Sequence, residues 1–416
     1  MFNQKKKYFI FPKLHFKHLL FLFFLIIAFI KKGIEIYFEE NQRLAVEFIK
    51  LYIYNIGDFF TIIPYIIMRK RMKIGKENNY PVSTYYIKYI YFNLNNKKFK
   101  FMTLRNIFIL TIVDFIAQIS TVIYYIINED KNFTVKQANL NSTLIFHIIF
   151  VIIFSILILH TKFYKHHLFA FSIDALCFIA LTIIDLTKIF RDKENNITMS
   201  IIYMLIIILV ALLYSLENVI SKYIFLVNFV STYGLILIKS SFHFVYLIIF
   251  SIPFIFRKID DEKGESRIIF SMIADVFKDK SYIFLFIGYT ITSFFHNNLC
   301  YKIIDIFSPN HFTISRLLEN VGIFIIDLIM DGYGSIGDLI VKIIMYILLI
   351  LAAFIYNEFL VINICGLSKN TKLFLDYEVE DELLFEKQSD DSSNLSSDTN
   401  DRDNTFGLNE IELVEK

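Results

Sequence analysis

The sequence predicts an all-α membrane protein with ten transmembrane helices, a class indicated by three observations. Hydrophobic residues make up 56% of the 416 positions, and the chain holds only 5 prolines and 12 glycines. Apolar runs long enough to cross a bilayer recur along most of the chain. About 20 apolar residues in a helix span the hydrocarbon core, and helices satisfy their own backbone hydrogen bonds there.

The expected spans follow from the apolar runs and the polar segments between them. The ten ranges are residues 14–31, 44–68, 103–127, 139–160, 166–187, 199–219, 232–256, 281–300, 310–330 and 336–360. The arm 1–13 and the loop after the second span are rich in Lys and Arg, which favours the cytosol for both. Ten crossings then leave both termini in the cytosol. The loop 257–280 is an exception, because it should be outside and yet holds six basic residues.

The ten spans divide into two halves of five. Residues 14–187 form the first five-helix repeat and residues 199–360 the second. Because five is odd, the second repeat would insert upside down relative to the first, an arrangement typical of secondary transporters. The segment 368–416 is rich in Ser, Asp, Asn and Glu, so we expect a disordered, acidic cytosolic tail.

Several spans carry polar side chains on one helical face. Ionisable groups at bilayer depth are costly, so they face a bundle interior or a wet cavity. The candidate residues for solute binding or ion coupling are Asp58, Asp114, Gln118, Glu217, Asn297, Arg316, Glu319 and Asn320. The three acids Asp58, Asp114 and Glu217 weigh most, because no cation stands beside them in the sequence. The alternatives are packing hydrogen bonds between helices and, for Arg316 with Glu319, a structural ion pair at i, i+3.

The sequence offers little for a cofactor or a metal. Cys177, Cys300 and Cys365 lie far apart, and no His, Cys or acidic residues stand at metal-ligand spacing. His166 and His167 are assigned to a cytosolic loop. The basic clusters lie beside spans, so nucleic acid is not expected as a partner. We therefore predict no catalytic residue, no metal and no cofactor.

Four motifs together resemble a known family. They are "YIYNIGDFFTIIPYIIMRKR" at 52–71, "TIVDFIAQIS" at 111–120, "LLYSLENVISKYI" at 212–224, and "FFHNNLCYKIIDIFSPNHFTISRLLENVGIFI" at 294–325 closed by "YNE" at 356–358. In order and spacing they resemble the drug/metabolite transporter superfamily, in the branch near the solute-carrier 35 F group and the chloroquine-resistance-transporter-like proteins. The fourth span departs from that pattern, because Ile145 and Ile148 stand where the branch tends to have Gln and Arg. The loop 257–280 also lacks the cysteines of the drug-resistance transporters.

The resemblance implies a ten-helix inverted-repeat fold that moves a small polar solute, such as a nucleotide sugar or an amino acid, across an internal membrane. We expect an integral multi-pass protein of the Golgi, endoplasmic reticulum, lysosome or vacuole, with the plasma membrane left open. A non-transporting scaffold that acts through the acidic tail is an alternative. A membrane-embedded transferase is another, although no DxD loop, HExxH or Gly-x-Ser-x-Gly motif supports an enzyme. A homodimer and a cytosolic partner of the tail also stay open.

Overall fold

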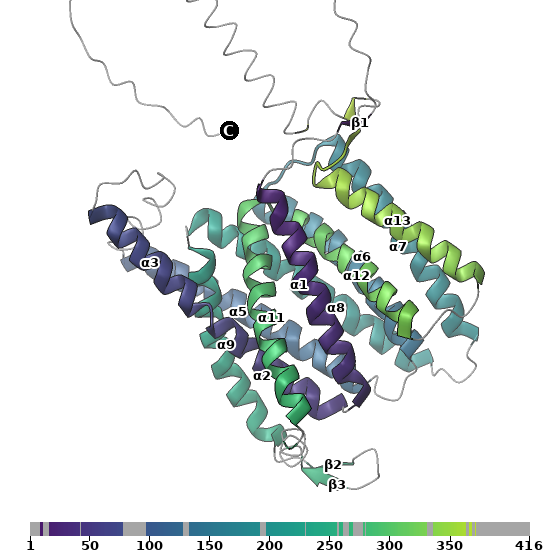
Figure 1. Cartoon of the computed structure of the whole chain (residues 1–416), viewed down its shortest axis with the longest axis horizontal. Coiled ribbons are helices and arrows are strands. Elements are labelled where there is room, and N and C mark those ends of the chain that lie inside the picture. The colour runs from purple at the N-terminus through teal and green to yellow at the C-terminus, as the bar shows by residue number, and fades with distance from the viewer. Residues whose placement is uncertain are drawn as a thin grey trace, which may run out of the picture.

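The protein is described by a computed structural model of the whole chain (Figure 1). The described residues are 9–10, 16–41, 43–77, 97–127, 133–191, 197–228, 230–255, 258–260, 266–268, 278, 280–330, 336–362, 366–367 and 371. The expected acidic tail therefore lies outside the described residues apart from Thr371, and so does most of the basic arm.

The described residues are mostly helical and form eleven α-helices. Their bounds are α1 Phe16–Asn41, α2 Arg43–Phe59, α3 Ile62–Glu77, α5 Lys97–Ile127, α6 Phe133–Leu159, α7 Lys165–Arg191, α8 Ile197–Val227, α9 Thr232–Ile255, α11 Lys280–Ile306, α12 Pro309–Met330 and α13 Ile336–Tyr356. Each range expected from the sequence is covered by helix, and several helices run past the apolar runs by a turn or more.

The second expected span, 44–68, contains two helices in line. α2 ends at Phe59 and α3 begins at Ile62. Between them the amide nitrogens of Phe60 and Thr61 donate to the carbonyls three residues earlier, at 3.1 and 3.0 Å. The cause is Pro64, which has no amide hydrogen and whose ring clashes with the carbonyl four residues before it. The helix therefore breaks one turn ahead of the proline.

Among the described residues, five helical segments are long and apolar enough to cross a membrane, which makes the chain a multi-pass membrane protein. They are Ile49–Lys70, Phe101–Ile123, Leu205–Val227, Thr232–Ile252 and Leu339–Tyr356. Their outer faces expose large apolar side chains, for example Phe108, Ile249 and Ile347. Exposed apolar surface of this extent is the kind that lipid covers.

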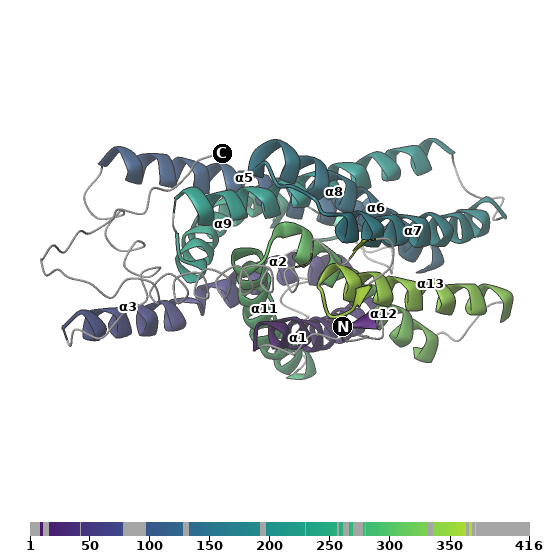
Figure 2. The ribbon, with the colours of Figure 1, turned by 90° about the horizontal axis from the view of Figure 1, so that it is seen from above.

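The helices lie in two layers, and each layer takes helices from both halves of the chain. Figure 2 shows α5, α8, α6 and α7 in one layer and α11, α1, α12 and α13 in the other. Helix α9 packs beside α5 and helix α2 beside α11. Within the first layer α8 contacts α5 and α6, and α6 contacts α7. Within the second α1 contacts α11 and α12, and α12 contacts α13. Across the layers α7 packs on α13, α6 on α12 and α2 on α9.

Two short strand pairs mark opposite ends of the bundle (Figure 1). Strand β1 (Phe9–Ile10) pairs antiparallel with β4 (Val361–Ile362), so the segments before α1 and after α13 meet at one end. Strands β2 (Lys258–Asp260) and β3 (Ser266–Ile268) form a hairpin at the other end, in the connection from α9 to α11.

The start of α7 differs from the expectation. His166 and His167 belong to its first turn and not to a loop, and His166 is buried. Tyr356, the last residue of α13, packs its ring against the rings of His167 and Phe171, with centroids 4.5 and 5.0 Å apart. The first turn of α7 is therefore part of the packed interior.

Candidate functional site

The most buried lysine among the described residues is Lys239, two turns into α9. Its side chain is 1% exposed, and its ammonium forms ion pairs with Asp114 of α5 and, at 3.0 Å, with Glu217 of α8. It also donates to the Tyr301 hydroxyl of α11 at 2.5 Å. α9 is otherwise rich in Ile, Leu and Phe, and its packing against α2, α3, α5 and α11 carries this lysine into the interior.

The two carboxylates are held by further donors. The Gln118 amide donates to Asp114 at 3.2 Å, one turn along α5, as their shared helical face predicted. The Tyr301 hydroxyl donates to Glu217 at 2.6 Å. A buried ion pair needs such extra bonds, because Coulomb attraction alone rarely offsets the loss of water around two charges. Four helices thus contribute to one connected polar cluster, which we call the Lys239 cluster: Asp114, Gln118, Glu217, Lys239 and Tyr301.

His243 extends this cluster by one turn of α9. Its Nε2 lies 3.1 Å from the carbonyl oxygen of Thr111 and 3.3 Å from the carboxylate of Asp114. Because both neighbours are acceptors, Nε2 must carry the hydrogen. The ring is fully buried, so it fixes the spacing of α9 and α5 beside the ion pair.

A second polar pair joins α2 and α11. The Asn297 amide donates to the Asp58 carboxylate at 2.6 Å, and the neighbouring Asn298 amide donates to Thr61 at 3.1 Å. Gly57 allows this contact, because a Cβ there would lie 2.9 Å from the Thr290 carbonyl oxygen. Asp58 is fully buried and lies within electrostatic range of Lys239.

Arg316 and Glu319 of α12 face neighbours on other helices. The Arg316 guanidinium carbon lies 5.7 Å from the Tyr214 ring centroid, within cation–π range. The Glu319 carboxylate lies 3.5 Å from Nε2 of His296. His296 directly precedes Asn297, so consecutive residues of α11 contact Glu319 and Asp58.

A histidine network joins α6, α8 and α12. Nδ1 of His147 lies 2.8 Å from the Ser215 hydroxyl, and the Asn218 amide lies 3.3 Å from Nε2. The Thr313 hydroxyl lies 3.5 Å from the same Nε2. His147 lies between the two isoleucines that occupy the Gln and Arg positions of the resembling branch, and it supplies the polar group of this span.

Among the sequence-predicted residues, Asp114, Gln118 and Glu217 meet in the Lys239 cluster, and Asp58 meets Asn297. Arg316 and Glu319 lie on α12 in the neighbouring group. Asn320 belongs to α12, and its side chain lies outside the described part of the structure.

The expectation that the buried acids have no adjacent cation is wrong, because Lys239 lies between two of them. The sequence did carry a signal. Lys239, Ser240 and His243 stand at i, i+1 and i+4 in an otherwise apolar span, which puts all three toward the bundle. Because the polar residues of this span are few, its hydropathy alone does not single it out.

No protein-family model and no curated protein matches the chain. Among the solved structures that resemble it, one described as "Crystal structure of protein" has a TM-score of 0.46 and 11% identity, over 82% of this chain and 98% of that chain. At that identity and score, the likeness adds nothing to the assignment of function.

Proposed function

We propose that this chain is a secondary transporter of the drug/metabolite type, which moves a small polar solute across an internal membrane by alternating access. The observation that carries the proposal is the Lys239 cluster. Charges buried among apolar helices are costly and mark solute or ion pathways in membrane proteins. Here an ammonium and two carboxylates are buried on three helices that are each long enough to span the bilayer.

The packing of the helices supports two inverted repeats of five. In the two halves α1 corresponds to α8, α2 to α9, α5 to α11, α6 to α12 and α7 to α13. The contact of α5 with α8 therefore corresponds to that of α11 with α1, and the contact of α6 with α7 to that of α12 with α13. In the same way the contact of α9 with α5 corresponds to that of α2 with α11. Each of these contacts is present, so the pattern fits a ten-helix fold in which α2 and α3 together form the second span.

The polar pairs follow the same correspondence. Lys239 of α9 meets Asp114 of α5, and Asp58 of α2 meets Asn297 of α11. Inverted-repeat transporters bind their solute near the midplane, where the repeats meet. The two pairs are therefore our candidate for the two sides of one binding site.

The charges favour a solute that bears both an amine and an acid, such as an amino acid. The Lys239 cluster holds one ammonium and the two carboxylates of Asp114 and Glu217, and Asp58 lies within electrostatic range as a third carboxylate. A cationic group or a coupled proton is therefore favoured there. Arg316 is the group we propose for an anionic part of the solute, because guanidinium binds carboxylates in two-pronged fashion.

The paired segments before α1 and after α13 support an even number of crossings, because β1 and β4 lie at one end. We propose that this end is cytosolic and that the membrane is internal. Protease protection of tags placed at each terminus in sealed vesicles tests the orientation. Digestion of one tag and protection of the other would contradict it.

The direct test is counterflow in proteoliposomes with the purified full chain and labelled amino acids, nucleotide sugars and organic cations. We expect saturable uptake of one class that depends on a counter-substrate, and its loss in Arg316→Ala protein with an unchanged melting temperature. A chain truncated after Leu367 should transport normally. Absence of exchange with every class, from folded protein, would favour the scaffold function instead.

A further inference from the structure

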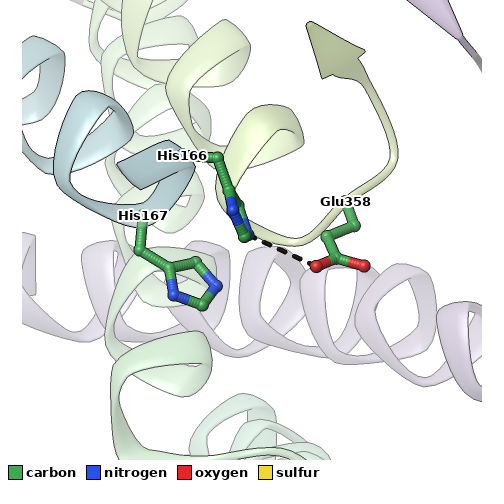
Figure 3. A group of neighbouring side chains, drawn as sticks. All are labelled: His166, His167 and Glu358. Atoms are coloured by element: carbon green, nitrogen blue, oxygen red, sulfur yellow. Dashed lines mark ion pairs between the residues drawn. The ribbon is translucent and has the colours of Figure 1, made fainter. Parts of the chain in front are cut away.

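Two histidines and a glutamate converge at the end of the bundle that carries β1 and β4 (Figure 3). His166 and His167 lie in the first turn of α7, and Glu358 lies just beyond the end of α13. One ligand atom from each residue lies within 4.8 Å of the other two. Nε2 of His166 is 3.3 Å from the Glu358 carboxylate, and the two imidazole centroids are 4.0 Å apart.

The two imidazoles have unused ligand atoms. The His166 side chain is 4% exposed, yet both of its ring nitrogens and Nδ1 of His167 have no hydrogen-bond partner among the described residues. Leaving a buried polar atom unpaired costs free energy, so such atoms usually have a partner. The unpaired ring nitrogens indicate a partner that the described residues do not supply.

The backbone of Glu358 is the second, independent observation. Its φ is 57°, in the left-handed region where a helix most often ends on glycine. A glutamate there is strained, and such strain clusters where a side chain is used. The strained residue is also the one whose carboxylate faces His166.

We propose that His166, His167 and Glu358 bind a divalent transition-metal ion, with Zn²⁺ as the best fit. Two imidazoles and one carboxylate are a donor set that Zn²⁺ takes in proteins, with water in the fourth position. Tetrahedral bonds of about 2.0 to 2.1 Å put neighbouring ligand atoms about 3.3 Å apart. The His166–Glu358 pair already has this separation, at 3.3 Å, and the remaining atoms, within 4.8 Å, close to it by side-chain rotation.

A metal here would join the two halves of the chain. It would tie the start of α7 to the end of α13, two helices that already pack together. The ring of His311, near the start of α12, lies 6.0 Å from that of His167, so a third helix borders the site. None of the three ligands belongs to the Lys239 cluster, and the proposal does not depend on transport. Ring stacking with Tyr356 accounts for the position of His167, but it explains neither the unpaired nitrogens nor the strained glutamate.

The test uses the full chain, purified without a polyhistidine tag, stripped with a chelator and dialysed against micromolar ZnCl₂. We expect one zinc per chain by elemental analysis. We also expect a rise in melting temperature of roughly 3 °C at a hundredfold excess over Kd. His167→Gln should lose both signals. Glu358→Gly should lose both as well, while its metal-free form melts no lower than the wild type, because glycine suits the left-handed backbone.

His160→Gly is the matched control. His160 is an exposed residue that also has a left-handed φ, of 50°, beyond the end of a helix, α6. This variant should bind zinc as the wild type does. Wild-type protein without zinc, or equal binding by the wild type and the His167→Gln and Glu358→Gly variants, would overturn the proposal.

Discussion

Replacing Lys239 with methionine removes the ammonium that lies between two buried carboxylates. The side chain is 1% exposed, and those of Asp114 and Glu217 are 2% and 9% exposed, so water cannot take its place. Removing one partner of a buried ion pair costs about 3 to 5 kcal/mol, chiefly because the remaining charge is left uncompensated. Two carboxylates remain here, so we expect a loss in the upper half of that range.

The assay is thermal unfolding of the purified protein in detergent. A loss of about 4 kcal/mol corresponds to a fall in melting temperature of roughly 5 °C for a chain of this size. Lys70→Met is the control, because Lys70 lies exposed on α3 and its loss uncovers no buried acid. An unchanged melting temperature in Lys239→Met protein would refute the claim that this ammonium neutralises the two acids.

A triple variant separates stability from transport. Asp114→Asn, Glu217→Gln and Lys239→Met together remove all three charges at nearly constant volume, and neutral replacements of buried ion networks are often as stable as the original. We expect the melting temperature to return to within about 1 °C of the wild type, equivalent to about 1 kcal/mol. We expect no counterflow from the triple variant, because the three charges proposed to act in transport are missing. Normal counterflow by the triple variant would refute a role for these charges in transport.

Two further predictions concern the contact of α2 with α11. Gly57→Ala places a Cβ 2.9 Å from the Thr290 carbonyl oxygen. We expect the two helices to separate at a cost of about 1 to 3 kcal/mol in unfolding free energy, measured as a lower melting temperature. Gly33→Ala is the control, because open space surrounds that glycine. Asn297→Leu removes the donor 2.6 Å from Asp58, which should cost about 1 to 3 kcal/mol in unfolding free energy and abolish uptake. Equal stability of Asn297→Leu and wild-type protein would contradict the reading of this pair as a buried hydrogen bond.

The sequence predicts the helices well because an apolar run of about 20 residues has few other stable structures in a membrane. It also predicts that Asp114 and Gln118 share a face, since they stand four residues apart on one helix. The break before Pro64 was missed although proline is a local signal, because the surrounding run is continuously apolar. Hydropathy alone cannot distinguish one long helix from two short helices in line.

Contacts between distant helices could not be read from the sequence. Which face of α9 meets α5 depends on how the helices pack, so Lys239 gave no sign of its two acidic partners. The two histidines and Glu358 are separated by almost half the sequence, and the packing of α7 on α13 brings them together. Local patterns determine the elements, whereas side-chain clusters depend on the order of the helices in the two layers.

The two layers are tied by charged contacts at the end that carries β1 and β4. Lys222 of α8 donates to the Asp305 carbonyl of α11 at 2.7 Å, and Thr232 of α9 donates to the Asp305 carboxylate at 3.0 Å. Hydrogen bonds that involve a charged group contribute about 1.5 to 3 kcal/mol each, so these contacts hold α8, α9 and α11 together at this end. The alternating access that we propose requires these bonds to break when the site opens to this side.

Lys222→Met should therefore favour opening at this end. The assay labels Cys300 with a membrane-impermeant maleimide in protein whose Cys177 and Cys365 are replaced by serine. Cys300 lies one to two turns before Asp305 in α11 and is 7% exposed, so it should react slowly. Loss of about 2 kcal/mol of closing energy shifts an opening equilibrium about thirtyfold, because each 1.4 kcal/mol is a factor of ten. We expect Cys300 labelling in the Lys222→Met variant to accelerate by about that factor. An unchanged labelling rate would contradict the claim that the hydrogen bond between Lys222 and Asp305 limits opening at this end.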